Sequence, residues 1–173
     1  MDTGIVNLLA IVGIFIVLLL TFRSLSLPLI LLFTIETAIW INLSFPYFAG
    51  NALSFIGYLI ISTVQLGATV DYAILFTDTY LNNRKTLDKK EAMRLTIEDK
   101  LTAILISAGI LAIAGFTLAY TSSNPIISDL GTLLGRGTLL SLAMVSFVLP
   151  ALLVLLDGVI QKTTLKSGFQ KDS

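Results

Sequence analysis

The sequence predicts an all-α membrane protein built as a bundle of five transmembrane helices. Hydrophobic residues make up 55% of the 173 residues and charged residues only 13%, and the mean hydropathy of +0.92 is far above that of a typical soluble domain. The apolar residues form five continuous runs, each near the roughly 20 residues that cross a bilayer as a helix. Because these runs lack the alternating pattern of a membrane barrel, helices are favoured over strands.

The five spans are expected at about residues 4–22, 27–45, 53–81, 101–120 and 130–156, within a transmembrane domain of residues 1–157. The first span has no basic region before it and Arg23 behind it, so it does not resemble a cleavable signal peptide. The second carries Pro28 in its first turn, where a helix tolerates proline. The third, about 29 residues long, must tilt or project beyond a hydrocarbon core of about 30 Å. A polar cytoplasmic tail follows at residues 158–173.

The basic residues predict the orientation of the bundle. They lie in alternate connections and in the tail, whereas the opposite connections, 46–52 and 121–128, carry none. Because lysine and arginine are enriched in cytoplasmic loops, the N-terminus is expected outside and the C-terminus in the cytoplasm. The residues that support this orientation are Arg23, Arg84, Lys85, Lys89, Lys90, Arg94, Lys100, Lys162, Lys166 and Lys171.

Residues 88–100 predict an amphipathic helix on the cytoplasmic surface. Asp88, followed three residues later by Glu91, is typical of a helix start. Apolar side chains then recur at helical spacing and run directly into the fourth span. A solvated connector without activity of its own is the favoured interpretation of this segment.

Small residues in the last two spans predict close helix packing. The fourth span is rich in alanine and glycine, and the fifth carries Gly131 and Gly135 four residues apart. Arg136 is the only basic residue inside a predicted span. It lies roughly 10 Å deep, shallow enough for its long side chain to reach outward to the interface.

An acid within the third span is the main functional candidate. An aspartate near the centre of a membrane helix costs roughly 2.5–3.5 kcal/mol, so Asp71 is expected to have a role that justifies its position. Proton or ion transfer, substrate contact and a structural ion pair with Arg136 all remain open. Asp78 lies seven residues further on the same helical face, and Gly67 on that face indicates that a neighbouring backbone packs closely against it.

Two further acids are secondary candidates. Glu36 lies about nine residues into the second span, roughly 13 Å deep, and functional and structural roles are both open for it. Asp78 lies near the cytoplasmic boundary, where a hydrated interfacial acid is the favoured interpretation.

Residues 67–74, with the sequence GATVDYAI, resemble the Asp-Tyr motif of MMPL-type transporters, a branch of the resistance-nodulation-division superfamily. The resemblance continues through the helix that begins at Asp88 and through the glycine-rich and 149–153 segments of the last span, and it corresponds to the last five helices of the family. It implies that Asp71 and Tyr72 belong to an intramembrane proton relay that drives export of lipids or other hydrophobic compounds across the inner membrane of a bacterium. The implied partners are membrane lipids, a hydrophobic substrate and the other membrane half of the transporter.

Complete members of that family have two related membrane halves and two large outer domains, whereas this chain resembles the C-terminal membrane half alone. We therefore expect a piece of a longer protein, or a subunit that pairs with itself or with a separate half. Two alternatives are a lipid-binding, sterol-sensing-like module without transport and an inactive C-terminal fragment. The resemblance assigns no role to Glu36, Asp78 or Arg136 and does not identify the substrate.

The residue types argue against several other functions. Cysteine and histidine are absent, and there is no Ser/His arrangement, phosphate-binding glycine loop or metal-ligand cluster. An enzyme, a cofactor and a metal site are therefore not expected. A net charge of zero gives no indication of nucleic-acid binding.

Overall fold

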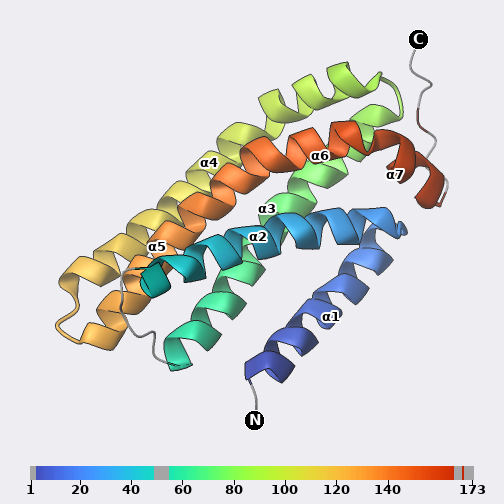
Figure 1. The fold of residues 1–173 in the computed structure, drawn as a ribbon. Helices are drawn as coiled ribbons and strands as arrows, with labels where there is room; N and C mark the ends of the chain where they lie inside the picture. Colours follow the sequence, from blue (N-terminus) through green and yellow to red (C-terminus); the bar gives the residue numbers. More distant parts are fainter. Residues whose placement is uncertain (1–2, 49–54, 166–168, 170–173) are drawn as a thin grey trace.

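The structure is a computed structural model that describes residues 3–48, 55–165 and 169 (Figure 1). All regular elements among these residues are helices, which confirms the all-α class. They are α1 (Thr3–Phe22), α2 (Ser26–Phe48), α3 (Phe55–Arg84), α4 (Lys89–Thr121), α5 (Pro125–Ala143), the π-helix η1 (Met144–Val148), α6 (Leu149–Leu155) and α7 (Asp157–Thr163).

Four helical stretches within the described residues are long and apolar enough to cross a membrane. They are Gly4–Phe22, Ser26–Phe48, Lys89–Thr121 and Pro125–Leu155. The predicted third span corresponds to α3, which carries Gln65, Asp71 and Asp78 and is not among the four. The chain is thus a membrane protein with several apolar helices.

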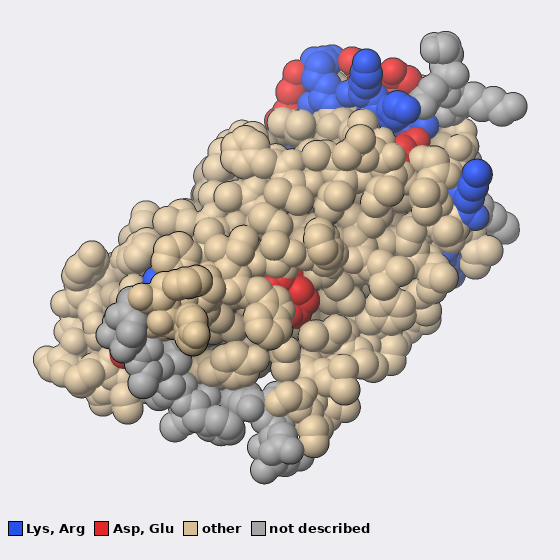
Figure 2. All heavy atoms as spheres, in the orientation of Figure 1, with Lys and Arg blue, Asp and Glu red and all other residues tan. Residues whose placement is uncertain are grey.

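The helices lie side by side along one long axis, with their connections gathered at the two ends (Figure 1). One end holds the α1–α2 turn, the α3–α4 connection and α7, and the other holds the α4–α5 connection (Figure 1). On the face that Figure 2 shows, charged side chains gather at the first end and are sparse over the rest of the body. We call this the basic end, defined by Arg23, Arg84, Lys85, Lys89, Lys90, Arg94, Lys100 and Lys162.

The predicted amphipathic helix and the fourth span form one continuous helix, α4. Asp88 caps it, because the Asp88 side chain accepts a hydrogen bond from the Glu91 backbone N–H at 3.1 Å. Arg94 forms ion pairs with Glu91 and Glu98 on the exposed surface of this first part. The helix start that the sequence predicts at Asp88 is therefore present.

The last apolar run bends through a π-helical turn. Pro150 has no backbone N–H and its ring would clash with a carbonyl one turn earlier, so an α-helix cannot continue through it unchanged. η1 lies directly before Pro150, and the Leu149 N–H donates to the Met144 carbonyl five residues back. This wider turn lets α5, η1 and α6 form one long membrane-crossing stretch.

The end of the chain folds back onto the basic end. α7 begins at Asp157, and beyond it the Leu165 N–H donates to the Arg23 carbonyl at 3.1 Å. The Ser26 and Thr163 hydroxyls lie 2.6 Å apart. The first part of the segment expected as a polar tail is therefore helical and packed against the α1–α2 turn.

Candidate functional site

α3 presents two opposite faces with different surroundings. Exposed residues recur at helical spacing along one side of α3, and buried residues recur along the opposite side, as expected for a helix that packs on one side only. The open face consists of Val64, Gly67, Asp71, Leu75, Asp78 and Asn82. The buried face consists of Ser62, Gln65, Leu66, Thr69, Ala73, Phe76, Thr77, Tyr80 and Arg84.

Asp71 lies in the middle of the open face, with its side chain exposed. Within the described part of the chain, Asp71 makes no hydrogen bond or ion pair. Tyr72 is half-buried at the edge of the core, and its hydroxyl has no hydrogen-bond partner among the same residues. Because consecutive residues diverge by about 100° on a helix, the two side chains leave α3 in different directions.

Gly67 lies on the same open face. A Cβ atom added at Gly67 would meet nothing within 4 Å, so this glycine faces open space and not a packed neighbour. Within the described residues no neighbouring helix packs over Gly67, so close packing around Asp71 stays a prediction. α3 packs against the other helices through its opposite side, where the buried face lies.

A cluster of buried amides and hydroxyls joins the buried face to α2 and α5. The Asn42 side-chain amide donates to the Gln65 side-chain oxygen at 2.9 Å, and the Gln65 amide donates to the Gly137 carbonyl and the Ser141 hydroxyl at 3.2 Å each. Thr69 donates to Ser141 at 2.7 Å. Since these groups are satisfied in a buried environment, the cluster fixes the positions of three helices relative to one another.

Arg136 belongs to this cluster and not to an ion pair with Asp71. Its Nε donates to the Asn42 side-chain oxygen at 2.8 Å, and its Nη2 donates to the Asn42 backbone carbonyl at 3.1 Å. The guanidinium lies 4.5 Å from the centroid of the Phe45 ring, within cation–π range. The ion pair considered from the sequence is therefore absent among the described residues, and a neutral amide accepts the hydrogen bonds of Arg136 instead.

Glycines determine how closely α4 and α5 approach each other. A Cβ at Gly131 would lie 2.5 Å from the Ala119 backbone nitrogen and 2.6 Å from the Gly115 carbonyl oxygen. A Cβ at Gly135 would lie 3.0 Å from the ring of Phe116. The backbones of α4 and α5 are thus in contact where Gly131 faces Gly115 and Ala119, and a larger residue at Gly131 would prevent this contact.

Glu36 and Asp78 lie in different environments. Glu36 is half-buried on α2, and its Oε1 atom is buried without a hydrogen-bond partner among the described residues. Asp78 is exposed near the basic end and accepts a hydrogen bond from the Asn82 amide at 3.3 Å. The structure does not bring either acid into contact with Asp71.

A buried ion pair at the basic end was not predicted from the sequence. Arg84 makes two hydrogen bonds to Asp157, Nε to Oδ1 at 2.9 Å and Nη2 to Oδ2 at 2.8 Å. The Tyr80 hydroxyl donates to Asp157 Oδ1 at 2.6 Å. The Arg84 Cζ atom lies 5.3 Å from the centroid of the Phe169 ring. These contacts join the end of α3 to α7. The sequence signal was weak: Asp157 directly follows a long apolar run, and Arg84 lies three residues after Leu81, the end of another.

Among the described residues, no group of three or more acidic side chains could hold a metal ion. The structure instead combines helices apolar enough to cross a membrane, a buried polar cluster between them and an isolated acid on an open helix face. These features define a multi-helix membrane module. A sequence profile of the MMPL family matches residues 1–166, and the chain belongs to that family.

Two relatives from Streptomyces coelicolor show how much of a longer protein the module represents. ActII-3 is 30% identical over 144 residues, which cover 80% of this chain and 20% of ActII-3. SCO0839 is 26% identical over 160 residues, which cover 88% of this chain and 22% of SCO0839. The chain therefore spans about a fifth of the length of the curated relatives that it matches.

Proposed function

We propose that the chain is the transmembrane module of a proton-driven exporter of lipids or other hydrophobic compounds, with Asp71 and Tyr72 in its proton relay. The observation that carries the proposal is the isolated, exposed carboxylate of Asp71 on a helix packed within a membrane bundle. An acid at that depth is costly unless it has a functional partner or titrates. Membership of the MMPL family supports the same assignment.

The proposal includes five spans, with α3 as the third. A helix that carries a proton relay need not be as apolar as its neighbours, because other helices can cover its polar positions in the assembled protein. The basic end then faces the cytoplasm, since cytoplasmic loops carry the excess of lysine and arginine. The membrane is proposed to be the inner membrane of a bacterium.

A second membrane half is proposed to cover the open face of α3. The module spans only about a fifth of its curated relatives, so most of a relative's length is available to supply that half. Asp71 and Gly67 would then face the partner half, where a small residue permits close approach. The second half belongs to the same polypeptide, to a separate subunit or to another copy of the chain.

The buried cluster is proposed to hold α3 at a fixed rotation so that Asp71 keeps facing the partner half. Gln65 and Thr69 are buried and hydrogen-bonded to α5 on the opposite side of the helix. Turning α3 about its axis would break these bonds and leave buried polar groups unpaired, at about 1–3 kcal/mol each. Such rigid positioning suits a relay in which donor and acceptor must stay within hydrogen-bond reach.

The test is proton-coupled export by the complete transporter that contains this module, reconstituted in vesicles. Asp71→Asn keeps the size of the side chain but cannot release a proton, so export and proton flux should fall to background. Tyr72→Phe should lower both without affecting insertion. Asp99→Asn, which neutralises an exposed acid paired with Lys100 on α4, is the matched control and should leave both unchanged. Full export by Asp71→Asn would exclude the relay, and the absence of both export and Asp71-dependent proton flux in the unaltered protein would favour a binding module.

A further inference from the structure

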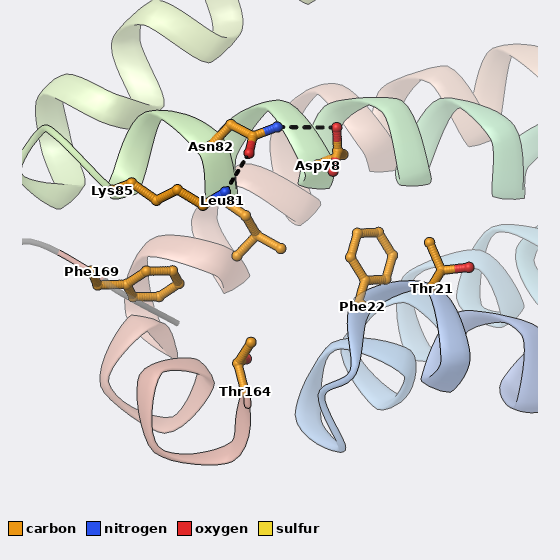
Figure 3. Close-up of a pocket in the computed structure, with 8 residues that line it drawn as sticks. All are labelled: Thr21, Phe22, Asp78, Leu81, Asn82, Lys85, Thr164 and Phe169. Atoms are coloured by element: carbon orange, nitrogen blue, oxygen red, sulfur yellow. Dashed lines mark hydrogen bonds between the residues drawn. The ribbon is translucent and has the colours of Figure 1, made fainter. Parts of the chain in front are cut away.

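A polar cleft opens at the basic end of the open face. It has a volume of about 170 Å³ and is bordered by α1, by the last turns of α3, and by Thr164 and Phe169 (Figure 3). Its lining residues are Thr21, Phe22, Asp78, Leu81, Asn82, Lys85, Thr164 and Phe169. The volume is several times the roughly 30 Å³ that one water molecule takes up in the liquid, so the cleft can hold a small group of waters.

Asp78 is the acid of this cleft, and it lies on the same helical line as Asp71. Seven residues separate the two carboxylates, which corresponds to two helical turns and about 10 Å along the axis. Asp78 is exposed, so its carboxylate can exchange protons with water in the cleft. Two hydrogen bonds link it to the next residues of α3: the Asn82 amide donates to Asp78 at 3.3 Å, and the Asn82 side-chain oxygen accepts from Lys85 Nζ at 2.8 Å (Figure 3).

From this arrangement we infer that Asp78 and its cleft form the cytoplasmic proton port of the relay, the place where protons that have passed Asp71 enter the cytoplasm. The inference rests on the proposed function, because it requires Asp71 to carry protons and the basic end to face the cytoplasm. Asp71 releases a proton to a water chain along the open face, Asp78 accepts it, and Asp78 then gives it to the water of the cleft. Asp78 thereby returns to its carboxylate form, and Asp71 is reset when it takes up the next proton from the outer side, so the cycle moves one proton inward and needs no other reactant.

The surroundings of Asp78 suit a group that binds and releases protons repeatedly. Among the described residues that line the cleft, Lys85 is the only charged side chain besides Asp78, and it belongs to α3 itself. The other described lining residues outside α3 are uncharged: Thr21 and Phe22 from α1, and Thr164 and Phe169 after α7. No described cation pairs with Asp78, so no ion pair has to break when it is protonated.

The experiment measures inward proton flux through the complete transporter in vesicles with a pH-sensitive dye, for the unaltered protein and for Asp78→Asn. A positioned proton-transfer group contributes roughly 10²–10⁴-fold, but water in an open cleft can partly replace it, so we expect flux to fall about tenfold. An excess of formate on the cytoplasmic side should restore most of the flux, because a small carboxylate can enter the cleft and replace the missing one. Asp78→Glu should keep near-normal flux, and Asp99→Asn is again the control.

Three results would overturn the inference. Unchanged flux in Asp78→Asn, while Asp71→Asn abolishes it, would reject the port and leave the proposed relay intact. Reduced flux that formate does not restore would mean that Asp78 has a structural role. Full flux in Asp71→Asn would reject the relay itself, and the port with it. Formate rescue of Asp78→Asn but not of Asp71→Asn is the pattern that supports the inference.

Discussion

The buried and open faces of α3 use polar residues in opposite ways. On the buried face, Gln65 and Thr69 bond to α5, and Tyr80 and Arg84 bond to Asp157 at the start of α7. On the open face, Asp71 has no partner within the described residues. Polar groups on either face would be costly to bury in an apolar environment. The hydrogen bonds and the ion pair of the buried face offset this cost inside the module, whereas nothing in the described chain offsets it for Asp71.

This difference separates residues that hold the module together from residues available to act. A satisfied buried network stabilises one arrangement of helices, so changing any member should alter stability first. An unpartnered group on an exposed face contributes little to the stability of the module, so changing it should alter function first. Substitutions on the two faces therefore test the division directly.

The largest loss of stability is expected from Asp157→Asn on the buried side. The Asp157 carboxylate accepts hydrogen bonds from Arg84 and Tyr80 and is 5% exposed at its side chain. The change removes the carboxylate charge that pairs with the buried Arg84 guanidinium, and breaking a buried ion pair in this way costs about 3–5 kcal/mol. Thermal unfolding of the purified chain in detergent should show a clearly lower midpoint.

Two variants control for this result. Asp99→Asn breaks an ion pair whose acid is 61% exposed, and it should change the midpoint little. The double variant Arg84→Met with Asp157→Leu removes both charges and should lose less stability than Asp157→Asn alone. Equal melting of Asp157→Asn and the unaltered chain would contradict a buried, stabilising ion pair.

A smaller loss is expected from Gly131→Ala at the α4–α5 contact. The added Cβ would lie 2.5 Å from the Ala119 backbone nitrogen and 2.6 Å from the Gly115 carbonyl oxygen, and backbone atoms cannot move aside as a flexible side chain can. Forcing an extra methyl group into such a contact typically costs about 1–3 kcal/mol. The same melting experiment measures it, and unchanged stability would mean that α4 and α5 pack less closely than the structure indicates.

The sequence predicted the helical class, the Asp88 cap and the position of α3 because these depend on local composition and spacing. Long apolar runs must form helices in lipid, and an acid followed by Glu91 three residues later satisfies helix-end N–H groups regardless of the rest of the fold. Tertiary partners could not be predicted in this way. Asn42 and Gln65 are ordinary polar residues in the sequence, and only the packing of α2, α3 and α5 brings them together.

The candidate site illustrates the same limit. The motif around Asp71 identified the residue, but which side of α3 is covered depends on distant segments, and no described segment packs over Gly67. Arg136 was considered as an ion-pair partner because it is the only cation in a predicted span. The structure gives it Asn42 and Phe45 from α2 instead, and among the described residues it forms no ion pair.

The smallest effect on stability is expected from Gly67→Ala on the open face. A Cβ there meets nothing within 4 Å, so no clash opposes the change. Alanine restricts the unfolded chain more than glycine and favours a helix. The free energy of unfolding of the isolated chain should therefore stay unchanged or rise by about 0.4–1 kcal/mol. Export by the complete transporter should nevertheless fall if a partner half packs closely over Gly67. A loss of stability in the isolated chain would show that this face is already covered within the module, whereas unchanged stability with reduced export would place the missing contact in the partner half.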